Sequence, residues 1–407
     1  MKNKKSTMAC KILALLFVIS IASDCDAAAR TLKIPLTRST VQQAGEFGQP
    51  VINYYTTVAI GTPEKRFKIQ FDVNYNELFV PHYEWTLFRP YLHYSSGFQC
   101  KVSSSCVKTD LSLTTTYQNC KLTGKPYEDY IRFEKALPLG PQATSTQSIG
   151  QQAQQNSSVE TKRFRQNFLA IGDASDGRFK DLEVDGYFGL SPAQQSPNGV
   201  LSLLLNLHKA DLIDSFQFSF WFNPVLDNDQ GGELVIGGID PSRYNGQIYW
   251  HTLNPLPHDQ WTLNLQYVTL GQQTISLDCS KTSPCQVVLS TGVSDIYGPR
   301  DEVNKLYNLL NIIQPSKKSL PLLDCRRIPQ LPTINFMIDG IAYTLLPSNY
   351  VRKTVDGTYF KSETCYVAVL PSDNFHPRQW TLGTNFLGAY YSVFDMNFRQ
   401  VGFASLR

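Results

Sequence analysis

Charged residues are scarce in this chain of 407 amino acids. They make up 17% of it, with 37 lysines and arginines against 34 aspartates and glutamates, and the formal net charge is +3. The basic residues are scattered along the sequence. Nucleic acids and anionic membrane surfaces select strongly basic surfaces, so we expect neither as a partner.

Long hydrophobic runs are missing as well. The apolar run Ile12–Ile21 is too short to span a bilayer. It follows Lys2, Lys4 and Lys5 and precedes small residues, which is typical of a secretory signal peptide, here residues 1–28. A short membrane anchor is the alternative, and it fits this length and these flanks less well. The mature protein is therefore expected to be secreted and extracellular.

Metal-ligand spacing is absent from the histidine pattern. The six histidines are His82, His93, His208, His251, His258 and His376. We predict no metal and no other cofactor, although a metal site built from residues distant in sequence stays open.

Turn-forming and aromatic residues, in contrast, are abundant. The chain has 25 glycines and 23 prolines, and 12% of its residues are aromatic. This composition suits an all-β secreted protein better than a helical one. Without the signal peptide, roughly 380 residues remain, which is long enough for two lobes with substantial cores.

The cysteines support an oxidising compartment. Cys10 and Cys25 lie in the predicted signal peptide, so seven of the nine cysteines remain. Their spacing is typical of disulfides in a secreted protein but does not fix the pairing. The remaining seven are Cys100, Cys106, Cys120, Cys279, Cys285, Cys325 and Cys365.

One motif occurs twice along the chain. The β-prone segment 286–289 runs into the turn Ser290-Thr291-Gly292, and the segment 67–71 runs in the same way into Asp72. An apolar-apolar-Gly partner follows each, at 184–190 and at 380–383. The repetition indicates a duplicated half with pseudo-twofold symmetry.

These segments resemble the two active-site loops of pepsin-like aspartic proteases. The resemblance covers nearly everything from Asn53 to Arg407 and implies an all-β, bilobal fold with a few short helices, one of them after Pro299. It places the N-terminal lobe at 53–221 and the C-terminal lobe at 222–407. It also implies the disulfides Cys100–Cys106, Cys279–Cys285 and Cys325–Cys365, which leaves Cys120 unpaired, either as a buried thiol or as a link between two chains.

The residues 29–52 resemble a shortened pro-segment. The stretch Thr31–Arg38 is similar to its first strand, but too few residues follow to fill a cleft. We expect no activation cleavage, so that this strand stays in place. The family also has a hairpin, the flap, with a tyrosine at its tip. We expect it between Tyr130 and Phe168, where this sequence offers no matching tip.

The chemistry of the family needs two aspartates that share one proton. Asp72 keeps the first position, but Ser290 replaces the second aspartate, and a serine hydroxyl is far too weak an acid to take its role. The surrounding positions depart from the family pattern too. Val73 replaces a Thr, Asn74 replaces a Gly, and Tyr75 and Val293 each replace a Ser or Thr. Thr291 and Gly292 are kept. Ser290 as a nucleophile lacks a Gly-x-Ser-x-Gly setting and an assignable histidine.

The sequence therefore predicts a secreted homologue that has lost proteolysis and binds an extended peptide or another small ligand between its lobes. Two alternatives stay open. The chain could be a residual acid endopeptidase that uses Asp72, or an abundant secretory protein without a specific ligand. We expect a monomer, unless Cys120 forms an intermolecular disulfide. Asn156 lies in the sequon Asn-Ser-Ser and is a predicted glycosylation site.

Overall fold

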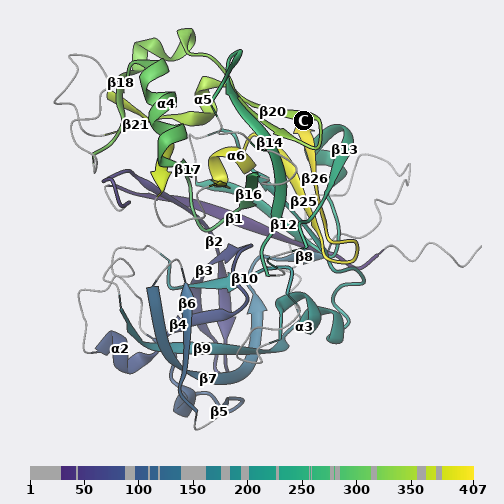
Figure 1. Ribbon diagram of the computed structural model, residues 1–407. Coiled ribbons are helices and arrows are strands. Elements are labelled where there is room, and N and C mark those ends of the chain that lie inside the picture. Colours follow the sequence, from purple (N-terminus) through teal and green to yellow (C-terminus); the bar gives the residue numbers. More distant parts are fainter. Residues whose placement is uncertain are drawn as a thin grey trace, which may run out of the picture.

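The computed structural model of the chain is shown in Figure 1. It describes residues 29–42, 45–87, 97–108, 111–117, 120–138, 162–175, 184–193, 201–225, 229–255, 257, 259–275, 279, 285–312, 319–354, 364–372 and 378–407. The predicted signal peptide and Asn156 lie outside these residues. Within them, no helix is long and apolar enough to cross a membrane.

Fifteen strands form one large sheet that passes through both halves of the molecule. Thirteen of them follow each other in the order β13-β26-β25-β11-β12-β1-β2-β3-β10-β4-β9-β7-β5, while β6 pairs with β7 and β8 with β1. In chain order, these strands are β1 (Leu32–Val41), β2 (Val51–Ile60), β3 (Lys65–Asp72), β4 (Leu78–Pro81), β5 (Val107–Lys108), β6 (Leu113–Tyr117), β7 (Cys120–Phe133), β8 (Leu137–Pro138), β9 (Phe164–Ala174), β10 (Gly186–Gly189), β11 (Gln217–Phe222), β12 (Gln230–Ile236), β13 (Tyr244–Thr252), β25 (Tyr390–Asp395) and β26 (Gln400–Leu406).

Two smaller sheets belong to the C-terminal half. The first has eight strands, seven of them in the order β20-β19-β14-β16-β24-β17-β23, with β15 beside β14. The second is β18-β22-β21. Their strands are β14 (Thr262–Leu270), β15 (Gln273–Thr274), β16 (Cys285–Leu289), β17 (Ile296–Pro299), β18 (Leu322–Asp324), β19 (Ile334–Ile338), β20 (Ile341–Leu345), β21 (Val351–Lys353), β22 (Thr364–Val367), β23 (Val369–Ser372) and β24 (Gln379–Leu382).

The α-helices within the described ranges are short: α2 (Tyr83–Leu87), α3 (Leu203–Lys209), α4 (Arg300–Leu310), α5 (Pro347–Tyr350) and α6 (Thr384–Leu387). The helix predicted after Pro299 is α4. Its Val303, Leu306, Tyr307 and Leu310 are buried on one face, as a 3.6-residue period requires.

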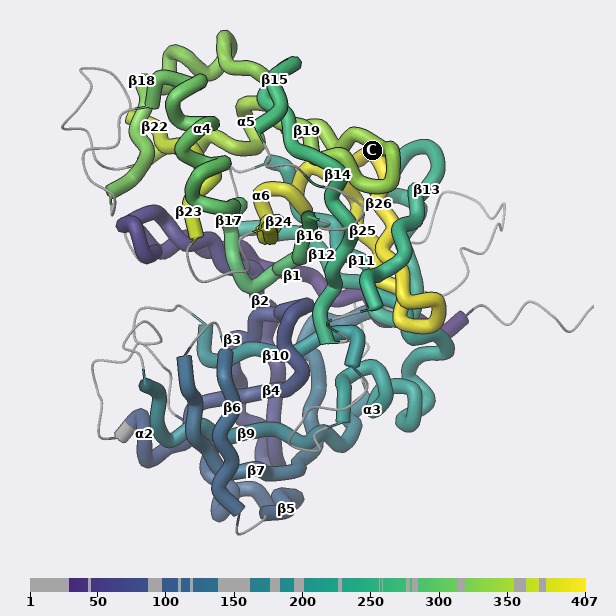
Figure 2. Tube along the Cα trace, in the orientation of Figure 1, coloured from purple at the N-terminus to yellow at the C-terminus, as the bar shows by residue number. Residues whose placement is uncertain are grey.

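The bilobal, mostly β fold expected from the sequence is confirmed. Figures 1 and 2 show the N-terminal strands β3, β4, β9 and β10 in one lobe and the C-terminal strands β14, β16, β17 and β24 in the other, with β1 running between them. The predicted boundary between residues 221 and 222 falls inside β11, a strand of the sheet that joins the lobes.

The N-terminal strand β1 is built into this joining sheet. It pairs with β12 from Leu32 to Thr37 and with β2 from Thr37 to Val41, both antiparallel. Leu32, Ile34 and Leu36 are buried in the main core, because the alternation of a strand points them to one face. Removing β1 would therefore expose apolar core and leave one edge of β12 and one edge of β2 unpaired.

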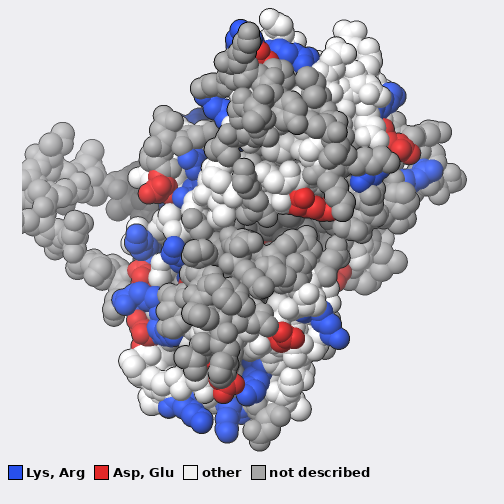
Figure 3. Space-filling model, turned by 90° about the vertical axis from the view of Figure 1, so that its left-hand side faces the viewer, with Lys and Arg blue, Asp and Glu red and all other residues white. Residues whose placement is uncertain are grey.

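The three disulfides implied by the resemblance are formed: Cys100–Cys106, Cys279–Cys285 and Cys325–Cys365. Cys120 is a free thiol and is buried. Basic and acidic side chains lie interspersed over the face shown in Figure 3, in keeping with the small net charge.

Candidate functional site

Two equivalent loops carry Asp72 and Ser290. Asp72 ends β3, which pairs in parallel with β10 so that Asp72 lies opposite Gly189. Ser290 follows β16, which pairs in parallel with β24 so that Leu289 lies opposite Leu382. In both halves the strand that follows the loop pairs antiparallel with that same partner strand. β4 pairs with β10 in the first half, and β17 pairs with β24 in the second. The duplicated motif seen in the sequence is thus a duplicated arrangement of strands.

Asp72 is almost completely enclosed, with 2% of its surface exposed. Its carboxyl accepts hydrogen bonds from the backbone amides of Asn74, at 2.9 Å, and Gly292, and from the Tyr117 hydroxyl. Burial raises the pKa of Asp72 above its usual value, and these donors reduce the rise. No second carboxyl is among the groups that set this pKa in the described part of the chain.

Ser290 occupies the corresponding position of the second loop and is 5% exposed. Its amide donates to the Leu382 carbonyl at 3.0 Å, and its hydroxyl oxygen accepts from the Gly292 amide at 3.2 Å. The Gly292 amide therefore lies between the Ser290 hydroxyl and the Asp72 carboxyl. A Cβ atom on Gly292 would come within 2.1 Å of an Asp72 carboxyl oxygen, so this close approach requires glycine.

Thr291 joins the first loop to the second by two hydrogen bonds, which we call the Thr291 clasp. Its hydroxyl donates to the Phe71 carbonyl at 2.7 Å and accepts from the Val73 amide at 3.1 Å. Val73 has no hydroxyl to return the contact. The Asn74 side-chain amide makes it instead, by donating to the Leu289 carbonyl. The departure of Val73 from the family pattern therefore does not leave the two loops without a second crossing bond, because the neighbouring Asn74 supplies it.

The remaining altered positions no longer serve Asp72. Tyr75 points its hydroxyl at Glu77, at 3.0 Å, and at Thr115, at 3.2 Å. Its ring packs edge-on against Phe79 and Tyr117 in a buried aromatic cluster. The Val293 carbonyl accepts from the Thr384 amide at 3.0 Å. Where the family pattern has hydroxyls directed at the acid, this chain has an aromatic contact and an aliphatic side chain.

The hairpin of β6 and β7 covers Asp72, and its position corrects the prediction for the flap. Tyr117 ends β6 and hydrogen-bonds to Asp72 through its hydroxyl. Tyr130 to Phe133, where the flap was expected to begin, instead lie at the end of the long strand β7, which pairs with both β6 and β9. Tyr117 has no recognisable flap signature in the sequence, because no glycines directly follow it, although the segment Leu113–Tyr117 has strand-forming threonines.

A second buried carboxyl, Asp295, lies five positions beyond Ser290. Its carboxyl accepts hydrogen bonds from the Asn385 side-chain amide at 3.0 Å and from the Tyr366 hydroxyl at 3.4 Å. Arg352 in turn donates to the side-chain oxygen of Asn385. Burial raises the pKa of Asp295 to about 7. Asp295 stands directly before the buried strand β17, and this position is the only local signal of its burial.

The start of β2 and the residues just ahead of it pack against this second loop and β17. The Ser294 hydroxyl accepts from the Ile52 amide at 2.9 Å and donates to the Ile52 carbonyl at 3.1 Å. The Gln49 amide donates to the Tyr297 hydroxyl at 3.2 Å, and Phe47 is buried in a cluster with Tyr366. The N-terminal segment thus contacts the C-terminal half beside Ser290.

Chemically, the site offers one enclosed carboxyl, one serine hydroxyl and a tyrosine hydroxyl. Among the described residues, no second acid shares a proton with Asp72, and the Ser290 hydroxyl accepts a hydrogen bond from a backbone amide. Within the described ranges, no three His, Cys, Asp or Glu side chains gather as a metal site would need.

The two lobes, the crossed loops and the covering hairpin define a protein of the aspartic protease class. The chain belongs to the eukaryotic aspartyl protease family, whose model matches residues 53–406. It is 28% identical to cathepsin D of Rattus norvegicus, with 92% of this chain and 87% of the relative covered. Cathepsin D of Homo sapiens is also 28% identical, over 86% of this chain and 80% of the relative. Cathepsin E of Aquarana catesbeiana is 26% identical, over 87% and 79%.

Proposed function

We propose that this chain is a secreted, non-proteolytic member of the aspartyl protease family. The observation that carries the proposal is the lone carboxyl of Asp72. Its counterpart, Ser290, accepts a hydrogen bond from Gly292 and cannot hold a shared proton. Losing one member of a cooperating catalytic set costs on the order of 10⁴ to 10⁶ in rate.

The role that remains is binding of an extended peptide or another small ligand between the lobes. Such a ligand can be held by strand-like hydrogen bonds without being cut. Support comes from what the chain retains, namely the Thr291 clasp and the hairpin that carries Tyr117. Because Asp72 and Ser290 are nearly closed to solvent, binding there requires the hairpin to lift and Tyr117 to release Asp72.

A protease assay between pH 3 and 7, with and without pepstatin, tests the loss of activity. The substrate is an acid-denatured protein, and Asp72→Ala is the matched variant. We expect no turnover above background in either protein. Pepstatin-sensitive digestion that disappears in Asp72→Ala would instead establish the residual endopeptidase, which is the second candidate because the first loop retains Asp72.

Hydrogen exchange tests the binding role. A peptide digest of casein serves as the probe, and amides of β6 and β7 are followed with and without it. We expect slower exchange in this hairpin. If neither the casein digest nor extracts of the protein's native fluid slowed amide exchange in this hairpin, the secretory protein without a specific ligand would be favoured.

The retained N-terminal strand belongs to the same proposal. Its pairing with β12 and β2 and the contacts of Ile52 and Gln49 with the second loop support a chain that keeps β1 after secretion. N-terminal sequencing of native protein should give a start near residue 29. A start near Gln49 would contradict it.

A further inference from the structure

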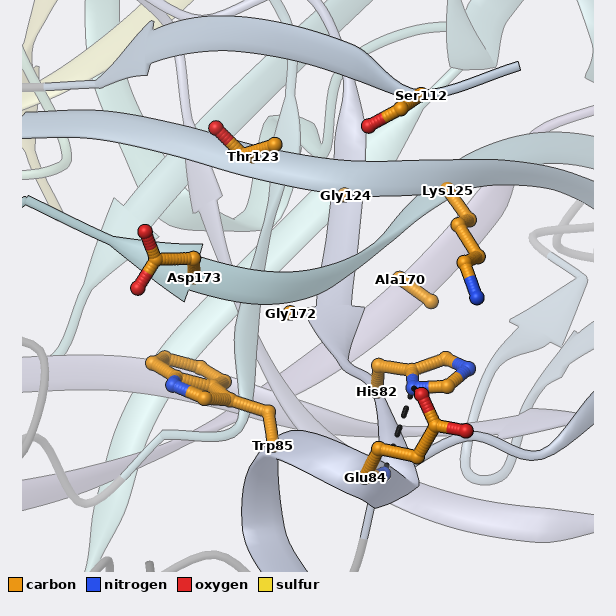
Figure 4. Close-up of a pocket in the computed structure, with 10 residues that line it drawn as sticks. All are labelled: His82, Glu84, Trp85, Ser112, Thr123, Gly124, Lys125, Ala170, Gly172 and Asp173. Carbon is orange, nitrogen blue, oxygen red and sulfur yellow. Dashed lines mark hydrogen bonds and ion pairs between the residues drawn. The ribbon is translucent and has the colours of Figure 1, made fainter. Parts of the chain in front are cut away.

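Two polar regions outside the paired loops differ in their exposure to water. The first is a hollow between α2 and the strands β7 and β9, where Lys125, Gly172 and Asp173 are exposed (Figure 4). Charges in contact with water interact only weakly with their neighbours. The second is the carboxyl of Asp295, which is 2% exposed. A charge formed there is costly unless the surrounding structure lets water reach it.

Neutral donors and one cation surround Asp295. Its Oδ1 atom accepts both from the Asn385 side-chain amide and from the Tyr366 hydroxyl. The guanidinium of Arg352 is linked to it through Asn385, whose side-chain oxygen accepts from Arg352 at 3.1 Å. Within the described residues, the titratable and charged groups that face this carboxyl are therefore Arg352 of β21, Tyr366 of β22 and Tyr307 of α4.

The tip of the hairpin that β1 and β2 form, residues 45–52, packs around this carboxyl. Ser294 comes directly before it in the sequence, and the Ser294 hydroxyl bonds to both the amide and the carbonyl of Ile52. Tyr366, one of the two donors to the carboxyl, lies in one apolar cluster with Phe47. Figure 2 shows this hairpin tip beside β17 and β23. The tip thus contacts two immediate neighbours of the buried acid.

The hairpin tip is the part of this enclosure that can separate without disrupting a sheet. β22 is paired with both β18 and β21 and carries a disulfide, and every residue of α6 is buried. The tip, in contrast, holds its own turn together, since the Gly45 amide donates to the Gln49 carbonyl at 3.0 Å. It can therefore move away as a unit once Ile52 leaves Ser294.

We propose that the hairpin tip is a pH-controlled latch, which is closed on the C-terminal lobe while Asp295 is neutral and is released when Asp295 ionises. Release exposes the carboxylate to water and so removes the cost of a buried charge. The pairing of β1 with β12 lies outside the tip and stays intact.

The direction of the pH dependence follows from linkage. Burial raises the pKa of Asp295 to about 7 in the closed latch, against the opposing effects of Arg352 and of the two hydrogen bonds. In the released state, the carboxyl returns towards the ordinary pKa of an aspartate. Closing therefore takes up a proton, and each pH unit above about 7 should weaken closure about tenfold.

Hydrogen exchange of the Ile52 amide measures the latch in the intact protein, because this amide loses its partner Ser294 on release. After correction for the intrinsic effect of pH on exchange, we expect its protection to fall about tenfold from pH 6 to pH 8. Ile52 should also exchange faster than the amides of β16, which open only when the lobe unfolds. Equal rates for Ile52 and β16 would mean global unfolding and would refute the latch.

Variants assign the pH dependence to Asp295. Asp295→Asn keeps an acceptor and cannot ionise, so its Ile52 protection should be the same at pH 6 and pH 8. Glu46→Gln is the matched control, because Glu46 is an exposed acid of the tip itself, and it should keep the tenfold change of the parent. The same tenfold change in Asp295→Asn would overturn the proposal. Should Asp295→Asn fail to fold, the parent still decides, since equal protection of Ile52 at both pH values would show that ionisation leaves the tip in place.

Discussion

The two half-sites share their strand arrangement and differ in what the loops between the strands contribute. The first loop keeps its acid, Asp72, and has lost the side chain that crosses to its neighbour. The second keeps the crossing side chain, Thr291, and has lost its acid. Its buried carboxyl, Asp295, lies five residues later and bonds to Asn385. The two loops therefore remain joined by hydrogen bonds, but they no longer present a pair of acids that can act together.

The buried acid of the second half should produce the largest effect on stability. The pKa of Asp295 is raised to about 7, so its neutral form is favoured in the folded state. Its contribution to the free energy of unfolding is fully present below about pH 4 and is lost as the pH rises through 7. Asp295→Asn keeps an acceptor for Asn385 and cannot ionise. We expect it to be on the order of 4 kcal/mol more stable than the parent at pH 8, and little changed at pH 4.

Urea unfolding at both pH values measures this difference. Asp259→Asn is the control, since Asp259 is exposed and should change the free energy of unfolding by less than about 0.5 kcal/mol. A stabilisation of Asp295→Asn that is the same at pH 4 and pH 8 would contradict the assignment.

The clasp between the halves should give the next largest effect. Thr291→Val leaves the Phe71 carbonyl and the Val73 amide buried without their partner. Such losses should lower the free energy of unfolding by about 3 kcal/mol. Thr116→Val on the exposed face of β6 is the control and should cost less than about 0.5 kcal/mol in the same urea titration. Equal midpoints for the two variants would show that the clasp does not hold the loops.

Alanine at the third position of either loop should destabilise the protein, but for opposite reasons. Gly292→Ala places a Cβ against Asp72 and should destabilise by about 2 kcal/mol through overpacking. Asn74→Ala removes the amide that bonds to the Leu289 carbonyl and should cost about 1 kcal/mol. Asn74→Gly, the residue of the family pattern, should not recover the loss. Full stability of Asn74→Gly would mean that the side chain does not replace the missing hydroxyl of Val73.

The smallest effect is expected from restoring the acid alone. Ser290→Asp should show no measurable digestion of an acid-denatured protein between pH 3 and 5, because Tyr75 bonds to Glu77 and Val293 has no hydroxyl to support a pair of acids. The quadruple change Ser290→Asp with Val73→Thr, Tyr75→Ser and Val293→Thr is the comparison. Strong turnover in Ser290→Asp by itself would show that the missing acid was the whole defect.

Much of the site could be predicted from its sequence pattern, but the covering hairpin could not. Asp72, Ser290 and their glycine-containing partner strands are local motifs, and the parallel pairing of β3 with β10 and of β16 with β24 follows them. Tyr117 has no local signature without the glycines, since its role depends on a hydrogen bond to a residue 45 positions earlier. The compensation by Asn74 was equally hidden, because it depends on a carbonyl in the other half of the chain.

The sequence by itself determined the β-rich duplicated fold, the cysteines available for disulfides and the loss of the second acid, because strand periodicity and residue identity are properties of short segments. Only the tertiary structure decided which groups meet: Tyr117 with Asp72, Ile52 with Ser294, and Asn74 with the Leu289 carbonyl. Hydrogen bonds and cavities form between atoms brought within a few ångströms by packing, and separation along the chain does not encode that distance.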